Sequence, residues 1–231
     1  MRRKVLGLFL SITGAVLNIA INRFCFAAGI PLFLDTILTV SVTLVAGLFW
    51  GILCGMLTNI VHHSIWFWGW DAYLFTICNI ATAYITWLFM RAFPHELQFL
   101  KPSRPVMLKS SRLNMAIGRI VVLMLLSFAL CLAMSILGGL LAALIIALEP
   151  SRLGLWGVSA LLSDTFGYGL PRILVEILSR IPVNIIDRLI VAFGGYGIAR
   201  AINALLAAYS RTPTAMEGRI KPGMEPSGDS T

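Results

Sequence analysis

The order of apolar and polar positions along the chain predicts six membrane-crossing helices. Apolar stretches near the roughly 20 residues needed to cross a bilayer recur between residues 4 and 208, separated by short polar or glycine-containing breaks. We predict helices at 4–22, 32–49, 51–67, 71–90, within 115–148, and at 183–208. The run from Ile120 to Leu148 has no charged residue and exceeds the length needed, so we expect this helix to tilt or to project beyond the lipid.

Composition predicts the class of protein, and the distribution of charge predicts its orientation in the membrane. Hydrophobic residues make up 58% of the chain and charged residues only 12%, which is far from a soluble domain. Lysine and arginine gather in three clusters, at Arg2–Lys4, Arg91–Arg119 and Arg200–Lys221. Because cytoplasmic flanks collect positive charge, we predict a multi-pass protein of the inner or plasma membrane with both termini cytoplasmic. The net charge of +8 then belongs to flanks that meet anionic lipid, and we do not expect nucleic-acid binding.

The predicted topology gives one all-α transmembrane domain, residues 1–211, followed by a tail. The tail, residues 212–231, is rich in proline, glycine, serine and charge, so we expect it to be a disordered cytoplasmic segment. The cytoplasmic link at Leu48–Trp50 is short. The outer face would hold three loops, at Asn22–Ile30, Ile65–Trp70 and Glu149–Ile181.

The segment Glu149–Ile181 predicts a short amphipathic helix near its end. Pro171 suits the first turn of a helix. Arg172, Glu176 and Arg180 follow at a spacing of four on one face, while leucines and isoleucines occupy the other. This pattern indicates an element that lies at the outer membrane interface. Whether it covers something in the membrane, as a lid would, or is only an interfacial helix stays open.

Small and amide residues follow two stripes of the first predicted helix. Gly7, Ser11 and Ala15 are spaced by four residues, which allows another helix to approach closely. That helix would belong either to a partner subunit or to this chain. Asn18 and Asn22 lie on a different face, where they would bond neighbouring helices or line a polar pocket near the outer end.

Polar side chains in the third and fourth predicted helices are candidates for solute binding. Asn59 and His63 lie on one stripe of the third helix, and Asn79 lies inside the fourth. Adjacent histidines on a helix, such as His62 and His63, point about 100° apart and chelate poorly, and no cysteine or carboxylate clusters with them, so we expect a hydrogen-bonding role and no metal site.

Aromatic and acidic residues near the outer face have two interpretations each. Trp66 and Trp68 either belong to the aromatic belt at the interface or form a stacking surface for a flat ligand. Tyr168 lies in the long outer segment. Asp35 and Asp187 lie near helix starts, where a carboxylate is favoured by the helix dipole. They would otherwise pair with an arginine or with a ligand cation.

Catalytic signatures do not occur in the sequence. We find no Gly-x-Ser-x-Gly, His-Glu-x-x-His or Gly-x-x-x-x-Gly-Lys pattern, so we expect neither enzyme activity nor a bound ATP or other cofactor. The four cysteines are scattered through apolar segments without ligand spacing, and we interpret them as small core residues.

Three stretches carry a resemblance to a known family. They read PLFLDTI at 31–37, GILCGMLTN at 51–59 and IPVNIIDR at 181–188. In this order and spacing the chain resembles the S components of energy-coupling-factor transporters, which are small and usually six-helix membrane subunits that bind vitamins or other micronutrients. The resemblance is best in the first three predicted helices and in the last.

The resemblance implies a function in solute import. An S component captures its solute at the outer face and docks, through small residues of its first helix, on a coupling membrane subunit driven by two ATPases, which hydrolyse the ATP. Gly7, Ser11 and Ala15 match that docking stripe in spacing. For the solute site the sequence favours seven residues, with Asp35 and Asp187 as a second tier: Asn22, Asn59, His63, Trp66, Trp68, Asn79 and Tyr168.

Two other functions remain open at this point. One is a membrane sensor or scaffold that signals through a partner without moving a solute. The other is a secondary carrier that transports a solute by itself. The sequence does not name the solute.

Overall fold

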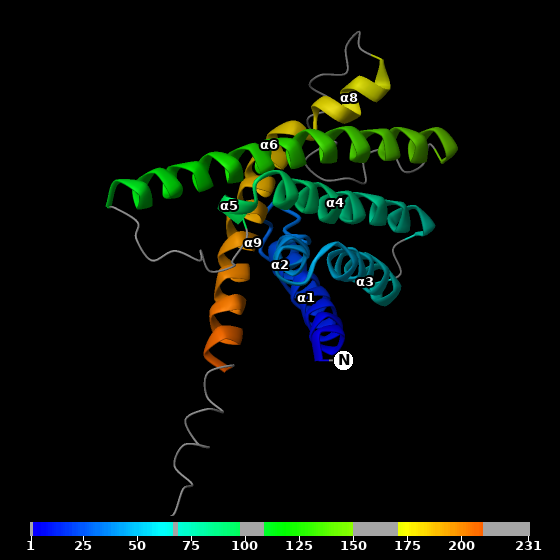
Figure 1. The fold of residues 1–231 in the computed structure, drawn as a ribbon. Helices are drawn as coiled ribbons and strands as arrows, with labels where there is room; N and C mark the ends of the chain where they lie inside the picture. The colour runs from blue at the N-terminus through cyan, green and yellow to red at the C-terminus, as the bar shows by residue number, and fades with distance from the viewer. Residues whose placement is uncertain (1, 67–68, 98–108, 150–170, 210–231) are drawn as a thin grey trace, which may run out of the picture.

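The structure is a computed structural model that describes residues 2–66, 69–97, 109–149 and 171–209. These residues form helices and no strand (Figure 1). The elements are α1 (Arg2–Ala27), α2 (Ile37–Ala46), α3 (Leu48–Trp66), the 3₁₀ helix η1 (Trp70–Phe75), α4 (Thr76–Ala92), α5 (Pro94–Leu97), α6 (Lys109–Leu148), α8 (Arg172–Leu178) and α9 (Ile181–Tyr209). The predicted tail, residues 212–231, lies outside the described residues.

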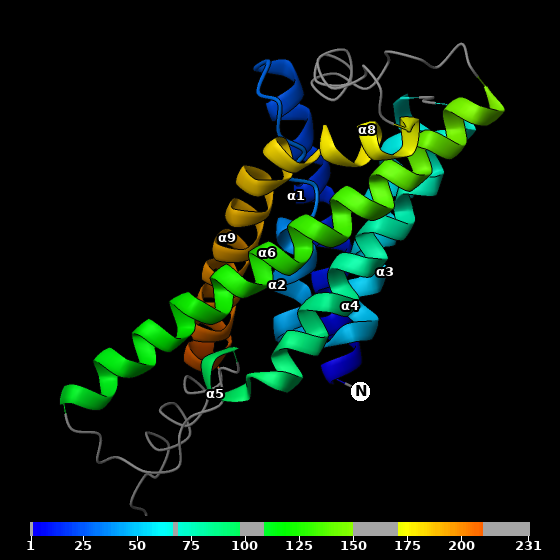
Figure 2. The ribbon, with the colours of Figure 1, turned by 90° about the horizontal axis from the view of Figure 1, so that it is seen from above.

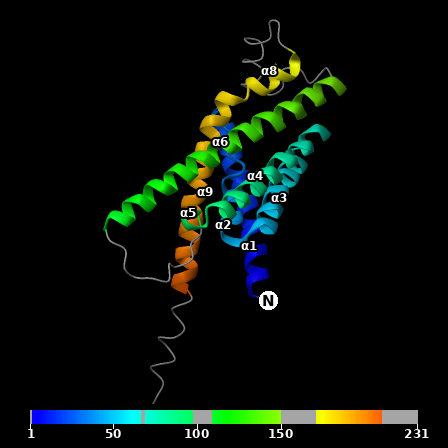
Figure 3. The same ribbon diagram turned by 45° about the horizontal axis from the view of Figure 1, so that its top comes forward.

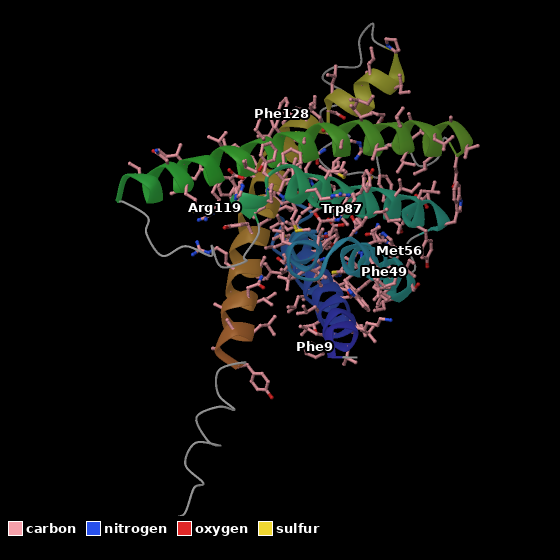
Figure 4. The ribbon with its side chains drawn as sticks, viewed as in Figure 1. Phe9, Phe49, Met56, Trp87, Arg119 and Phe128 are labelled. Atoms are coloured by element: carbon pink, nitrogen blue, oxygen red, sulfur yellow. The ribbon has the colours of Figure 1, made fainter. Side chains whose placement is uncertain are left out.

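Five helical segments of the described residues are long and apolar enough to cross a membrane. They are Lys4–Ala27, Leu48–Trp66, Trp70–Ala92, Leu113–Leu148 and Ile173–Tyr209. Large apolar side chains cover the outside of the bundle, as Figure 4 shows for Phe9, Phe49 and Phe128, each more than 60% exposed. Such a surface suits lipid and would be costly in water. The chain is therefore an all-α, multi-pass membrane protein.

The predicted helix at 32–49 is much shorter in the structure. It begins at Ile37 and ends at Ala46, and its ten residues are only about 15 Å long. Residues 37–44 are all buried, because α2 packs among α1, α3, α4 and α9. The apolar pattern could not reveal this, since the stretch 31–34 is apolar but is not helical. A φ of 96° at Gly47 allows an immediate reversal, so Leu48–Trp50 is the first turn of α3 and not a link.

The other predicted helices are found with shifted ends. α1 runs five residues beyond the predicted end, so Asn22 and Arg23 belong to a helix and not to an outer loop. The helix predicted at 71–90 is η1 followed by α4. α6 has 40 residues, about 60 Å, and crosses the other helices obliquely (Figures 2 and 3). α9 covers the predicted span 183–208 and begins at Ile181.

The two ends of the bundle differ in charge. Figure 2 places the start of α1, α5, the start of α6 and the end of α9 at one end of the bundle. Lys4, Arg119 and Arg200 belong to these segments, and Arg91 lies in the last turn of α4 directly before α5, so we call it the basic end. The end of α1, the end of α6 and α8 lie at the opposite end, which we call the far end (Figure 2).

Glycines let helices touch at two crossings that position the polar interior. A Cβ atom on Gly139 of α6 would lie 2.8 Å from the Cα atom of Ile177 in α8. A Cβ atom on Gly195 of α9 would lie 2.8 Å from the Val40 side chain of α2. Any larger residue would force these helices apart.

Candidate functional site

Asn18 joins three helices in the interior of the bundle. Its side chain on α1 is fully buried and donates to the hydroxyl oxygens of Thr39 on α2 and Thr58 on α3, at 3.2 Å each. Its Oδ1 atom accepts the backbone N–H of Leu38 at 2.9 Å. Leu38 lies in the first turn of α2, where backbone N–H groups have no partner within the helix. Asn18 thus bonds neighbouring helices, which was one of the two roles predicted for it.

The α1–α2 loop is fastened to α9 by one carboxylate. The Oδ1 atom of Asp187 accepts the backbone N–H groups of Phe33 and Leu34, both at 2.9 Å. Leu34 has a φ of 46°, a left-handed conformation that is uncommon for a leucine. Asn22 donates to the carbonyl of Phe33 at 2.7 Å from the other side. Asp187 lies in the second turn of α9 and does not cap it.

Arg188 completes the connection between α9 and the loop. Its Nη2 atom lies 2.9 Å from the Oδ2 atom of Asp187, and its Nη1 atom donates to the Thr36 hydroxyl at 2.7 Å. Asp187 and Thr36 are fully buried, and Arg188 is 5% exposed. A buried charge is tolerated when it is paired, and Asp187 and Arg188 pair with each other. The Oδ2 atom of Asp187 and the Nε atom of Arg188 have no hydrogen-bond partner among the described residues.

The side chains of Asn59 and Asn79, two predicted site residues, meet between α3 and α4. Asn79 of α4 donates to the Asn59 side chain at 3.1 Å and to the Gly55 carbonyl at 3.3 Å. The Asn79 amide also faces the carboxyl group of Asp35. Burial raises the pKa of Asp35 above its ordinary value, Arg188 opposes this shift, and the charge of Asp187 adds to it. Asp35 is two residues before α2 and does not cap it.

The charged face of α8 points into the protein. The predicted helix is present, since α8 begins directly after Pro171. Glu176 is 5% exposed and Arg180 is 9% exposed, whereas Leu174 and Leu178 on the apolar face are about 40% exposed. This is the reverse of an interfacial helix whose polar face meets water. In a membrane protein the lipid takes the apolar face, so the charged residues face the interior.

These groups converge in the half of the bundle nearer the far end. Asn184 of α9 donates to Ser135 of α6 at 2.9 Å. We call the whole set the buried polar cluster, in which Asp35 is half-buried and the other members are buried: Asp35, Thr36, Asn59, Asn79, Ser135, Glu176, Arg180, Asn184, Asp187 and Arg188.

A second group lies at the surface of the far end. The guanidinium carbon of Arg23 is 4.5 Å from the ring centroid of Trp66, a cation–π arrangement. The rings of His62 and Trp66 are 5.0 Å apart, and those of His63 and Tyr73 are 5.9 Å apart. The predicted residues His63 and Trp66 therefore belong to this aromatic group and not to the buried polar cluster.

The small residues of α1 pack inside the protein. A Cβ atom on Gly7 would meet the ring of Trp50 in α3. The Ser11 hydroxyl donates to the carbonyls of Gly7 and Trp50 at 2.9 Å each, and Ala15 is 4% exposed. Of the two interpretations that the sequence left open, the contact in this structure is with a helix of the same chain. Docking of a partner through the stripe stays a prediction.

Sequence reasoning found part of the buried polar cluster. Asn59, Asn79 and Asp35 come together with Asp187, while Asn22 lies beside the loop that Asp187 holds. Trp68 and Tyr168 lie outside the described residues.

Three charged members were not predicted as site residues, namely Glu176, Arg180 and Arg188. The signal for the first two was present, because charges spaced by four residues opposite an apolar face in a membrane protein indicate an inward face.

Neither a metal site among the described residues nor a related protein identifies the chemistry of the site. In the described part of the chain no three histidine, cysteine, aspartate or glutamate residues gather as a metal site requires. Comparison of the chain with protein-family models, with curated proteins and with solved structures gives no match.

Proposed function

We propose that the protein is the solute-binding membrane subunit of an ATP-driven importer of the energy-coupling-factor type, for a vitamin or other small micronutrient. The observation that carries the proposal is the buried polar cluster. Four buried ionisable side chains, the half-buried Asp35 and several amides lie inside an apolar bundle, where each is costly unless it has a function or a partner. A packing role alone would be met by apolar residues.

The proposed orientation places the basic end in the cytoplasm and the far end outside. The start of α1, the end of α4 and the end of α9, which carry Lys4, Arg91 and Arg200, lie at one end of the bundle, as a cytoplasmic flank does (Figure 2). The buried polar cluster then lies in the outer half of the membrane, where it meets a solute that arrives from outside. Five long helices and the short α2 would make up the six-helix arrangement of an S component.

The loop that Asp187 holds offers a route for the solute. The α1–α2 loop, residues 28–36, contains Asp35 and Thr36 and is fastened by side chains of α1 and α9. In the proposed cycle these bonds open at the outer face and close over the solute. The chain itself hydrolyses no ATP in this proposal, since partner ATPases and a coupling membrane subunit supply the energy.

Reconstitution separates this proposal from its alternatives. The chain is purified from its native membrane with any partners, and uptake by vesicles is measured with and without ATP. We expect a coupling subunit and two ATPases to co-purify, and uptake to require them. Uptake by vesicles that contain this chain alone would replace the proposal with a secondary carrier. Co-purification of a kinase without any uptake would replace it with a sensor.

A topology experiment tests the orientation separately. A reporter that is active only in the cytoplasm is fused after Thr212, and a second is fused before Arg2. Both should be active. If the reporter after Thr212 proves to be outside, the far end faces the cytoplasm and the capture of an external solute by this cluster is ruled out.

A further inference from the structure

Arg180 is a buried arginine whose surroundings do not satisfy its hydrogen-bond donors. It lies in the turn between α8 and α9 and is 9% exposed. Its side chain lies on α6 at Gly138, since a Cβ atom there would be 3.7 Å from the Arg180 Cδ atom and 3.9 Å from Nε. Its Nε and Nη2 atoms are buried without a hydrogen-bond partner among the described residues. A buried donor in this state is costly, and more so when it is charged.

Glu176 compensates the charge of Arg180 only weakly. Its Oε2 atom lies 3.8 Å from the Nη2 atom of Arg180, which is beyond hydrogen-bond distance. The side chains of both residues are at most 10% exposed. A buried ion pair offsets the loss of hydration only when its geometry is close and further hydrogen bonds complete it. The position of α8 in this structure is therefore unfavourable for both charges, and packing must hold the helix there.

The packing that holds α8 is a smooth contact with α6. Among the described helices α6 provides its main contact. A Cβ atom on Gly139 would lie 2.8 Å from the Cα atom of Ile177, so the two backbones touch. Gly138 and Gly139 carry no side chain that could interlock with α8. The helix can therefore separate from α6 at this point without moving an α6 side chain out of its way.

The connection between α8 and α9 is suited to a hinge. Ser179 and Arg180 form a turn that belongs to neither helix. Pro182 in the first turn of α9 has no backbone N–H, so it cannot donate the helical bond to the Leu178 carbonyl. The Arg180 N–H donates to the Ile177 carbonyl at 3.3 Å, a long bond. α8 can thus change its direction while α9 stays in place.

A second position would hydrate the charges of α8 and keep its apolar face in lipid. Leu174 and Leu178 are about 40% exposed, on the face opposite the buried Glu176. A short helix with this pattern is stable at a membrane surface, where its apolar face enters the lipid and its charged face meets water. α8 lies at the far end of the bundle, where spanning helices end, so this surface is within its reach (Figure 2).

We propose that α8 is a lid with two positions, one on α6 as in this structure and one at the membrane surface, joined by a hinge at Ser179 and Arg180. The closed position gains the contact with α6 and buries two charges, whereas the open position loses the contact and hydrates them. Opening uncovers the face of α6 that carries Gly139 and, one turn earlier, Ser135. The lid and the interfacial helix, which the sequence left as alternatives, are then two positions of one element. The proposal does not depend on the proposed function.

Hydrogen exchange of the full chain in lipid nanodiscs measures the opening. The amides of α8 are compared with those around the fully buried Val191 in α9. Because opening exposes α8 and leaves α9 in place, we expect the α8 amides to exchange at least about tenfold faster.

Removing both charges should close the lid. In the double variant Glu176→Leu with Arg180→Met the closed position buries no charge, so exchange in α8 should slow at least about tenfold. Glu176→Gln alone leaves Arg180 without its acidic neighbour, so α8 should exchange faster than in the wild type. Arg119→Met is the matched control, because Arg119 lies on the same helix α6 but binds the Glu96 carbonyl at the basic end (Figure 4). It should leave exchange in α8 unchanged.

Thiol labelling shows which face of the open helix meets water. With the four native cysteines replaced by alanine, Val175→Cys on the buried face is compared with Leu178→Cys on the exposed face. A charged, water-soluble thiol reagent should label Val175→Cys in lipid vesicles and label Leu178→Cys more slowly, because that face stays in lipid. The melting temperature verifies that each variant is folded.

Each outcome supports or overturns the lid. If the double variant exchanges at the wild-type rate, the buried charges do not drive opening and the proposal fails. It fails equally if the wild-type α8 amides are as protected as those around Val191. Faster labelling of Leu178→Cys than of Val175→Cys would place the apolar face in water and exclude the open position. Slower exchange in the double variant, unchanged exchange in Arg119→Met and preferred labelling of Val175→Cys establish the lid.

Discussion

The Oδ1 atom of Asp187 lies 2.9 Å from the backbone nitrogen of Leu34, although the two residues are 153 positions apart. This bond holds the left-handed turn of the α1–α2 loop against the second turn of α9. The same carboxylate pairs with Arg188, which in turn reaches Thr36. The loop and the last helix therefore form one unit at the edge of the buried polar cluster.

Removing this carboxylate should release the loop. In Asp187→Ala the Phe33 and Leu34 N–H groups lose their acceptor and Arg188 is left buried without its counter-charge, so we expect a loss of about 3–5 kcal/mol in the free energy of unfolding. Asp187→Asn keeps an acceptor oxygen and should lose less. Thermal unfolding and hydrogen exchange at Phe33 and Leu34 check this. Equal protection of these amides in the wild type and Asp187→Ala would contradict it.

Replacing Asn18 by leucine should destabilise the meeting point of α1, α2 and α3. The Leu38 N–H would remain buried without its acceptor, at a cost of about 1–3 kcal/mol. Asn114→Leu is a matched control, because Asn114 is exposed on α6. Chemical unfolding of both variants in the same detergent gives the comparison. A loss of stability as large in Asn114→Leu would show that the bonds of Asn18 are not the cause.

Two neighbouring glycines of α6 should respond oppositely to alanine. In Gly139→Ala the new methyl group meets the backbone of Ile177 at 2.8 Å, so α8 must shift and about 1–3 kcal/mol of stability should be lost. In Gly138→Ala it would be 3.7 Å from Arg180, an ordinary contact, and alanine favours the helix. The melting temperatures of the two variants test this pair. Similar values for both would mean that α6 and α8 are not in backbone contact.

Asp35 should make stability depend on pH in a defined direction. Its pKa is raised in the folded protein above the ordinary value of 3.8, so the folded state binds the proton more tightly than the unfolded state. The stabilisation that this provides is complete below 3.8 and is lost as the pH rises through the folded pKa. Asp35→Asn removes this dependence.

The measurement is a difference between two proteins. The melting temperature of Asp35→Asn minus that of the wild type should increase as the pH is raised from about 4 to 8. Other carboxylates titrate in both proteins and cancel in the difference. A difference that stays constant with pH would mean that the Asp35 carboxyl group has the same affinity for protons in the folded and unfolded protein.

Hydropathy predicted the long helices well but could not predict the length of the buried helix α2. The segments around α1, α3, α4, α6 and α9 were predicted because each contains a long apolar run. The apolar residues 31–34 look the same in sequence whether they form a helix or a loop, so α2 was predicted too long. The decisive difference is Asp187, whose bonds to the loop backbone replace those of a helix, and no local pattern reveals such a distant partner.

The sequence also predicted only some residues of the buried polar cluster. Asn59 and Asn79 were recognised because an amide in a membrane helix is unusual by itself. Glu176 and Arg180 were assigned to an interfacial face because charge was expected to seek water. Their actual direction depends on how α8 crosses α6 at Gly139, and this contact is a property of two helices together.

The length of α6 has a mechanical consequence. At one end it carries Gly118 and Arg119 beside Glu96, and twenty residues later it carries Gly138 against Arg180, about 30 Å away along one uninterrupted helix. A rigid rod that is displaced at one end must move at the other. A partner that pushes on the basic end of α6 would therefore displace the part of α6 against which Arg180 packs, without any signal passing through a loop.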